Sequence, residues 1–120
     1  MSEKIPLLVL NSLSQAHQAQ VAAVYDVTYL PVPTQAQRDE LIAAQGGRFR
    51  AVLTIGTIGL TGAEAAAMPK LERVCCMGAG YEGVALEAAR ARGIALANGA
   101  GTNDDCVADH AMGLLIGAMR

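Results

Sequence analysis

A glycine-rich hexapeptide is the feature of this sequence that most directly suggests chemistry. Residues 78–83 read Gly-Ala-Gly-Tyr-Glu-Gly, which matches the G-x-G-x-x-G pattern, follows an apolar run and opens an amphipathic segment. Glycines at such a turn let backbone amides approach a phosphate or carboxylate, and a helix N-terminus attracts the negative charge. The hexapeptide therefore indicates a dinucleotide-binding turn, a loop for a small anion at a helix N-terminus, or a turn that merely needs glycine.

The surroundings of the hexapeptide favour a small anion over a dinucleotide. A dinucleotide turn is followed, about 20 residues on, by an acidic residue that binds the ribose. The next apolar run instead ends in Ala97-Asn98-Gly99 and carries no acid. Tyr81 and Glu82 also make the loop bulkier than a tight phosphate turn. We therefore interpret residues 78–83 as a loop whose backbone amides meet a small anion.

Two further segments carry residues suited to ligand contact. Ile55-Gly56-Thr57-Ile58-Gly59 follows an apolar run, and its glycines permit close backbone approach, although taken alone it is better read as a plain loop. Gly99-Ala100-Gly101-Thr102-Asn103-Asp104-Asp105 precedes the last apolar segment, and its polar residues suit the start of a helix. Asn103 has a second possible use, which is to point its side-chain amide towards a bound carbonyl.

Histidine and cysteine chemistry is not predicted. His17 lies in a Gln-rich segment and should be solvated, whereas His110 has apolar neighbours and is interpreted as a buried or interface residue. A general acid or base needs a partnered, reachable imidazole. Three cysteines form no C-x-x-C pair and are interpreted as core residues: Cys75, Cys76 and Cys106. We therefore expect no metal site and no disulfide, and a reducing cytoplasm fits.

Composition and charge exclude several classes of partner. The 120 residues carry a formal net charge of −2, one Phe and no Trp, so the basic surface and stacking aromatics of nucleic-acid-binding proteins are missing. With 52% hydrophobic residues, the chain can form a core. No apolar run reaches the roughly 18 residues of a membrane span, and the first residues are no signal peptide. We expect neither nucleic acid nor a membrane as a partner.

Short apolar runs alternate with amphipathic segments along the whole chain. The pattern predicts strands over 5–10, 27–30, 51–55, 71–77 and 94–97, and helices over 14–24, 35–45, 61–68, 85–92 and 104–120. Such alternation is typical of a parallel sheet with helices on both faces. Five strands favour an α/β, flavodoxin-like fold with strand order 2-1-3-4-5, in which ligands bind beyond the carboxyl ends of the strands.

The last predicted helix, residues 104–120, is apolar on nearly every side after its first turns. A helix of this kind is buried. Gly113 and Gly117 would let another backbone approach it closely. We therefore expect this helix to need a partner.

The order of motifs from Leu71 to Arg120 resembles the D-isomer-specific 2-hydroxyacid dehydrogenases, particularly their glyoxylate/hydroxypyruvate reductase branch. The resemblance rests on five segments in order: Gly78-Ala79-Gly80-Tyr81-Glu82-Gly83-Val84, residues 86–94, Gly101-Thr102-Asn103, Val107-Ala108-Asp109-His110-Ala111, and Leu114-Leu115 through to Arg120. Residues 1–70 match only in their alternation of strands and helices.

This resemblance implies a division of the chain and a set of ligand contacts. Residues 1–103 would form the substrate-binding, or catalytic, domain, and the helix over 104–120 would lead to a nucleotide-binding domain that the sequence lacks. In that family the Gly-x-Gly loop gives backbone amides to the substrate carboxylate. The corresponding residues here are Ala79 and Gly80.

The resemblance also implies three less direct contacts. The loop with Ile55 and Gly56 would line the same substrate site. In related formate dehydrogenases an Asn at the place of Asn103 touches the substrate, and the position of Val107 approaches the nicotinamide. Val107 is thus the one cofactor contact expected in this chain.

The activity that the resemblance implies is reduction of small 2-oxo acids, such as glyoxylate or hydroxypyruvate, to D-2-hydroxy acids. NAD or NADP would be held mainly by the absent domain, and the protein would be a homodimer. The family's catalytic Arg, Glu and His have no counterpart in this sequence, so the chain is expected to be a truncated form that is inactive alone. The alternative is a free-standing flavodoxin-like binding or scaffold module that dimerises through its C-terminal helix.

Overall fold

The computed structural model describes residues 4–119 and contains every predicted strand and helix. The strands are β1 (Ile5–Val9), β2 (Tyr25–Tyr29), β3 (Ala51–Thr54), β4 (Arg73–Cys76) and β5 (Ala95–Asn98). The helices are α1 (Gln15–Val24), α2 (Gln35–Gln45), the 3₁₀ helix η1 (Gly46–Arg48), α3 (Gly62–Ala66), α4 (Leu86–Ala91) and α5 (Asp104–Ala118). The hydroxyls of Ser14, Thr34 and Thr61 cap α1, α2 and α3.

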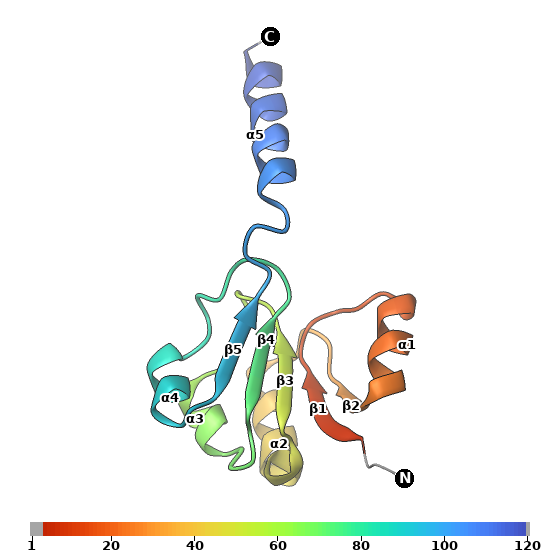
Figure 1. Ribbon diagram of the computed structural model, residues 1–120, viewed down its shortest axis with the longest axis vertical. Helices are drawn as coiled ribbons and strands as arrows, with labels where there is room; N and C mark the ends of the chain where they lie inside the picture. Colours follow the sequence, from red (N-terminus) through yellow and green to blue (C-terminus); the bar gives the residue numbers. More distant parts are fainter. Residues whose placement is uncertain (1–3, 120) are drawn as a thin grey trace.

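All five strands are parallel and follow the order β2-β1-β3-β4-β5, which confirms the predicted topology. Because every strand runs in the same direction, the loops that follow them meet at one edge of the sheet, the carboxyl edge (Figure 1). The loops that precede the strands meet at the opposite, amino edge. A site built from loops after different strands is therefore possible only at the carboxyl edge.

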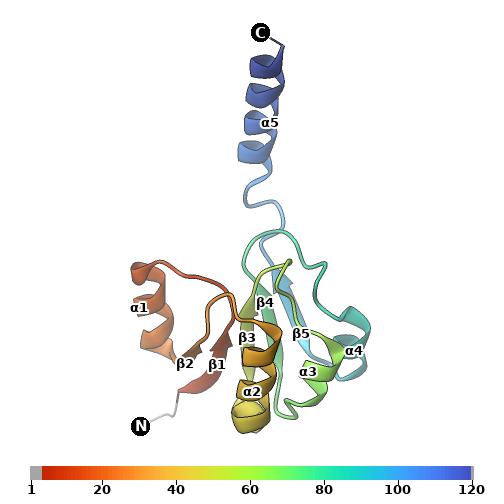
Figure 2. The same ribbon diagram turned by 180° about the vertical axis from the view of Figure 1, so that it is seen from behind.

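The main core lies between the sheet and helices α2, α3 and α4, which cover one face of it (Figure 2). Alternate strand residues point into this layer, and Leu8, Val52 and Val74 are at most 1% exposed. Phe49, next to β3, and Met68, next to α3, are fully buried in or beside the same layer. This face fixes the positions of the strand ends because its side chains are closely packed.

The opposite face of the sheet is covered only at its β1 and β2 end, where α1 lies (Figure 1). A shallow hollow of about 230 Å³ separates Val21 of α1 from Leu53 and Cys75. Cys76 is buried as predicted, but Cys75 points to the open face and is exposed. Cys106, on α5, is also exposed. Both of these were expected in the core, and that prediction is wrong because no element of the described chain covers them.

Helix α5 projects away from the body beyond the carboxyl edge (Figure 1). No residue of α5 is buried, and Val107 and Leu114 are 58% and 62% exposed. Nothing among residues 4–119 covers the helix, so the expectation that it needs a partner stays a prediction. His110 is exposed, so it is not a core residue of the described chain, and its interpretation as an interface residue also stays a prediction. His17 is exposed, as predicted. Across residues 4–119, no helix combines the length and the hydropathy that a membrane crossing requires.

Candidate functional site

The loops after β3 and β4 are joined at the carboxyl edge. We call residues 55–60 the β3 loop and residues 77–84 the β4 loop. The backbone amide of Gly83 donates to the carbonyl of Gly56 at 2.8 Å, and the amide of Leu60 donates to the carbonyl of Gly83 at 3.0 Å. These reciprocal bonds hold the two loops at a fixed separation.

Glycine is required at this contact because the two backbones touch. An ideal Cβ on Gly56 would lie 2.8 Å from the carbonyl carbon of Gly80. Gly59 has a φ of +63°, and a Cβ there would collide with the backbone of Gly83. We call these four residues the glycine junction. Gly56 and Gly80, both predicted from the sequence as site residues, thus lie together. The other two predicted residues, Ile55 and Ala79, directly precede them in the chain.

Backbone donors at the junction are unused. Among residues 4–119, no acceptor takes the amide hydrogen of Gly56, Ala79 or Gly80. Ala79 and Gly80 are exposed, whereas Gly56 is buried beneath the β4 loop. Backbone amides presented in this way suit a carboxylate or another small anion.

A third loop supports the β4 loop from the side of β5. The side-chain amide of Asn98 donates to the carbonyl of Ala79 at 2.7 Å, and the amide of Gly99 donates to the carbonyl of Gly78 at 2.7 Å. With the carbonyl of Ala79 held by Asn98, the orientation of the following peptide is restricted. Sequence reasoning missed Asn98, which it noted only as a residue that is not acidic.

A buried ion pair supports the β3 loop from within. Arg38 of α2 donates to both carboxylate oxygens of Glu64 of α3, at 2.6 and 2.7 Å, and to the carbonyls of Ile58 and Gly59 at 2.9 and 3.2 Å. The two side chains are only 8% and 5% exposed. The only sequence signal was the capping-box spacing of Thr61 and Glu64, and nothing local pointed to Arg38.

Glu82 of the β4 loop lies over the junction. Its Oε2 atom is 2.5 Å from an ideal Cβ on Gly56 and 2.6 Å from one on Gly80. The carboxylate thus fills the space that side chains would occupy at these two glycines. Burial, with smaller contributions from Cys75 and Glu82, raises the pKa of the Cys76 thiol below this loop. Sequence reasoning had noted Glu82 only for its bulk.

Asn103 and Val107 are not brought to the junction. Asn103 is the N-cap residue of α5, but its side chain makes no capping bond. No hydrogen bond in the described part of the chain joins Asn103 to the β3 or β4 loop. Val107 is on the projecting helix. Their ligand roles therefore stay predictions.

The described residues do not fit a dinucleotide at the hexapeptide. Helix α4 begins only at Leu86, after a non-helical Ala85, so no helix N-terminus directly follows the turn. The expected anion loop at a helix N-terminus is corrected accordingly, because the free amides are those of Ala79 and Gly80. No group of three or more His, Cys, Asp and Glu residues within 4–119 could hold a metal ion.

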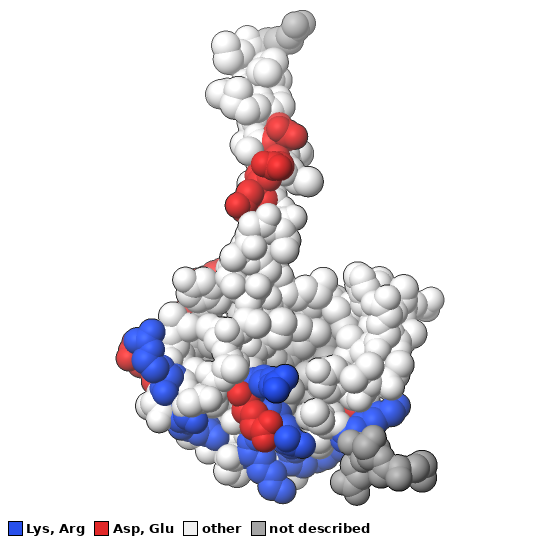
Figure 3. Space-filling view, in the orientation of Figure 1, with Lys and Arg blue, Asp and Glu red and all other residues white. Residues whose placement is uncertain are grey.

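Charge is distributed very unevenly between the two edges of the sheet. The loops after the five strands contain one charged residue, Glu82, and Asp104 and Asp105 begin α5 beyond them. In Figure 3, Lys and Arg gather on the part of the body far from α5, and acidic residues mark the start of α5. The carboxyl edge is thus electronegative apart from its backbone amides.

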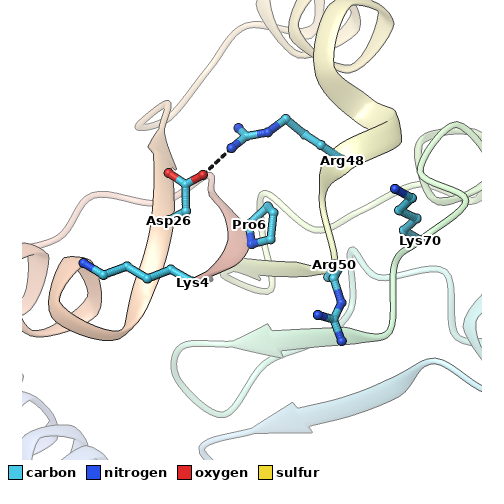
Figure 4. A pocket seen from close by; sticks show the side chains of 6 residues that line it. All are labelled: Lys4, Pro6, Asp26, Arg48, Arg50 and Lys70. Carbon is cyan, nitrogen blue, oxygen red and sulfur yellow. Dashed lines mark hydrogen bonds and ion pairs between the residues drawn. The ribbon is translucent and has the colours of Figure 1, made fainter. Parts of the chain in front are cut away.

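A second hollow, of about 640 Å³, lies at the amino edge (Figure 4). It is lined by Lys4, Pro6, Asp26, Arg48, Arg50 and Lys70. Arg48 pairs with Asp26, Arg50 donates to both oxygens of Glu72, and Lys4 donates to the carbonyl of Ala22. Figure 4 shows the ends of Lys4, Arg50 and Lys70 pointing in different directions. The basic groups therefore do not converge on one ligand position.

The fold and the junction define a class of protein: an α/β domain of flavodoxin-like topology that presents free backbone amides at its carboxyl edge. The family model "D-isomer specific 2-hydroxyacid dehydrogenase, catalytic domain" matches residues 7–113. The chain belongs to this family. The match also includes most of residues 1–70, where the sequence motifs alone gave only a pattern of elements.

Individual relatives agree with the family assignment. The D-3-phosphoglycerate dehydrogenases of Mycobacterium tuberculosis and Mycobacterium leprae are each 31% identical over 114 residues, which is 95% of this chain and 21% of the relative. The structure of a 2-hydroxyacid dehydrogenase from Ketogulonicigenium vulgare is 30% identical, with a TM-score of 0.84, and the match covers 96% of this chain and 36% of that one. A glyoxylate reductase from Paecilomyes thermophila shares the fold, with 20% identity and a TM-score of 0.81. The match covers 99% of this chain and 39% of that one.

Proposed function

We propose that this chain is the substrate-binding domain of an NAD(P)-dependent oxidoreductase that reduces small 2-oxo acids to D-2-hydroxy acids. The observation that carries the proposal is the set of unused amides at Gly56, Ala79 and Gly80. A carboxylate binds well to two or three backbone N–H groups. Every 2-oxo acid and its 2-hydroxy acid product carries such a carboxylate next to the reacting carbon.

In this proposal the chain's own residues bind and orient. The amides of Ala79 and Gly80 hold the substrate carboxylate, and Ile55 and Gly56 bound the same site. Holding the carboxylate fixes the adjacent carbonyl, which lowers the entropic cost of the reaction. Asn103 would direct its amide towards that carbonyl. NADH or NADPH supplies the hydride when bound, and Val107 is the one residue here proposed to approach it.

The proposed substrates are glyoxylate- or hydroxypyruvate-type acids, an assignment supported by the motif over residues 78–84. No acid–base pair lies at the junction in the described chain, because His17 and His110 are on α1 and on α5 and are exposed. We therefore propose that the chain is inactive alone and works with a nucleotide-binding domain reached through residues 104–120, with residues 1–103 as the substrate domain. A cytoplasmic homodimer completes the proposal.

A second candidate function is favoured by a specific observation. The apolar side chains of α5 are exposed along its whole length, including Leu115 and Ile116 at 56% each. A free-standing module that dimerises through α5 would cover them. This alternative requires no ligand at the glycine junction.

Amide-resolved NMR of the 120-residue chain tests the main proposal. Titration with D-glycerate should move the amide signals of Gly56, Ala79 and Gly80 and leave the amino edge unchanged. Gly80→Val should abolish these shifts while far-UV circular dichroism stays the same. Gly47→Val is the matched control, because a Cβ at Gly47 has no neighbour within 4 Å. Shifts that are absent from the junction, or equal in Gly80→Val, would refute the carboxylate site.

A measurement on turnover separates the two candidates. The purified chain should not oxidise NADH with glyoxylate, whereas the natural polypeptide that carries these residues should do so. An intact mass of that polypeptide shows directly whether it is longer than the 120-residue chain. A natural polypeptide of the same length, dimeric and without activity, would favour the free-standing module.

A further inference from the structure

We propose that Glu82 makes the glycine junction selective for 2-oxo acids whose carboxylate is their only anionic group, and that it disfavours substrates with an additional phosphate. This inference rests on the proposed function, because it assigns selectivity to the same site. The position of the Glu82 carboxylate supports it. That group lies against both Gly56 and Gly80, within 2.5 and 2.6 Å of their ideal Cβ positions.

The Glu82 carboxylate is not neutralised by a cation. None of the side-chain hydrogen bonds or ion pairs among residues 4–119 involves it. Arg38 reaches the inner side of the β3 loop, but its guanidinium is already bound to Glu64 and to two carbonyls. The charge of Glu82 therefore acts on whatever binds at the junction.

The donors at the junction suffice for one carboxylate. The amides of the exposed residues Ala79 and Gly80 can offset the repulsion between a single bound carboxylate and Glu82. A phosphate adds a charge of about −1.5 to −2 and needs donors of its own. The loops after the five strands contain no Lys or Arg to provide them. A phosphorylated acid at the junction would thus meet Glu82 without a compensating cation from these loops.

The curated relatives are named for a phosphorylated substrate, D-3-phosphoglycerate. For a second anionic group within a few ångströms of Glu82, electrostatic repulsion should weaken binding at least about tenfold.

The test compares two probes that differ only in a phosphate, D-glycerate and 3-phospho-D-glycerate, by amide-resolved NMR of the 120-residue chain at low salt. D-glycerate should shift Gly56 and Gly80, and 3-phospho-D-glycerate should need at least about ten times the concentration for the same shift. Only signals of the junction are counted, since the phosphate can also meet Lys and Arg at the amino edge. Added salt should reduce the difference between the probes.

Three variants isolate the role of Glu82. Glu82→Gln should reduce the difference between the probes several-fold, and Glu82→Asp, which keeps the charge, should preserve it. Glu87→Gln changes the net charge equally but on exposed α4, and should leave the difference unchanged. Circular dichroism verifies that each variant is folded.

The outcomes distinguish this inference from the proposed function. Equal affinity of the two probes in the unaltered chain, or an unchanged difference in Glu82→Gln, would overturn the role of Glu82 while leaving the carboxylate site intact. If D-glycerate shifts neither Gly56 nor Gly80, the proposed function fails and the selectivity falls with it.

Discussion

Replacing Arg38 with methionine should destabilise the domain strongly, because it leaves a buried charge without its partner. The guanidinium of Arg38 binds both carboxylate oxygens of Glu64 and the carbonyls of Ile58 and Gly59. Methionine has a similar length but donates no hydrogen bond. Glu64, whose side chain is 5% exposed, would keep only the backbone amide of Thr61 as a donor.

The expected loss of unfolding free energy is about 3–5 kcal/mol, which is typical when one partner of a buried ion pair is removed. A domain of this kind has a total stability of about 5–15 kcal/mol, so the loss is a large share of it. Urea unfolding followed by far-UV circular dichroism measures the change. The midpoint should fall by more than about 1 M.

The control is Arg90→Met, which breaks the Glu87–Arg90 pair. These side chains are 87% and 77% exposed, so their separation should cost less than about 1 kcal/mol. The double variant Arg38→Met/Glu64→Leu removes both buried charges and should recover part of the lost stability. The reasoning is refuted if Arg38→Met stays within about 1 kcal/mol of the unaltered chain, or if the double variant is no more stable than the single one.

Three further outcomes are expected. Gly59→Ala should lower the unfolding free energy by about 2 kcal/mol or more, because the residue has a positive φ and touches the facing loop, whereas Gly47→Ala should be nearly neutral in the same urea assay. Burial, the largest cause, raises the pKa of the Cys76 thiol from its ordinary value of 9.0, so stability should be constant below that pH and fall as pH rises towards the higher folded-state pKa. Cys76→Ala should abolish this decline, and an identical pH profile in the variant would contradict the assignment. Leu115→Lys should leave the unfolding free energy within about 0.5 kcal/mol and reduce any self-association seen by sedimentation velocity, since the side chain is 56% exposed; a loss above about 1 kcal/mol would show that α5 packs on the body.

The sequence by itself determined the order of elements, the parallel sheet and the edge at which a site could lie. These properties follow from local patterns: apolar runs of strand length, capping residues such as Thr34 and Thr61, and glycines after strands. The family resemblance assigned Gly56 and Gly80 to one site, and this is compatible with the shared edge at which parallel strands end. The ordered motifs after Leu71 indicated the family that the comparison over residues 7–113 shows.

Only the tertiary structure decided which groups contact that site and which surfaces stay uncovered. Arg38 and Glu64 are 26 residues apart, and no local pattern pairs them. The direction of Glu82 depends on the β3 loop that packs against its own loop. Cys75 and α5 have the composition of core segments and yet are exposed. A hydrophobic side chain is more stable when it is buried, but it can be buried only where another segment lies close to it. Which segments lie close together depends on packing between distant parts of the chain.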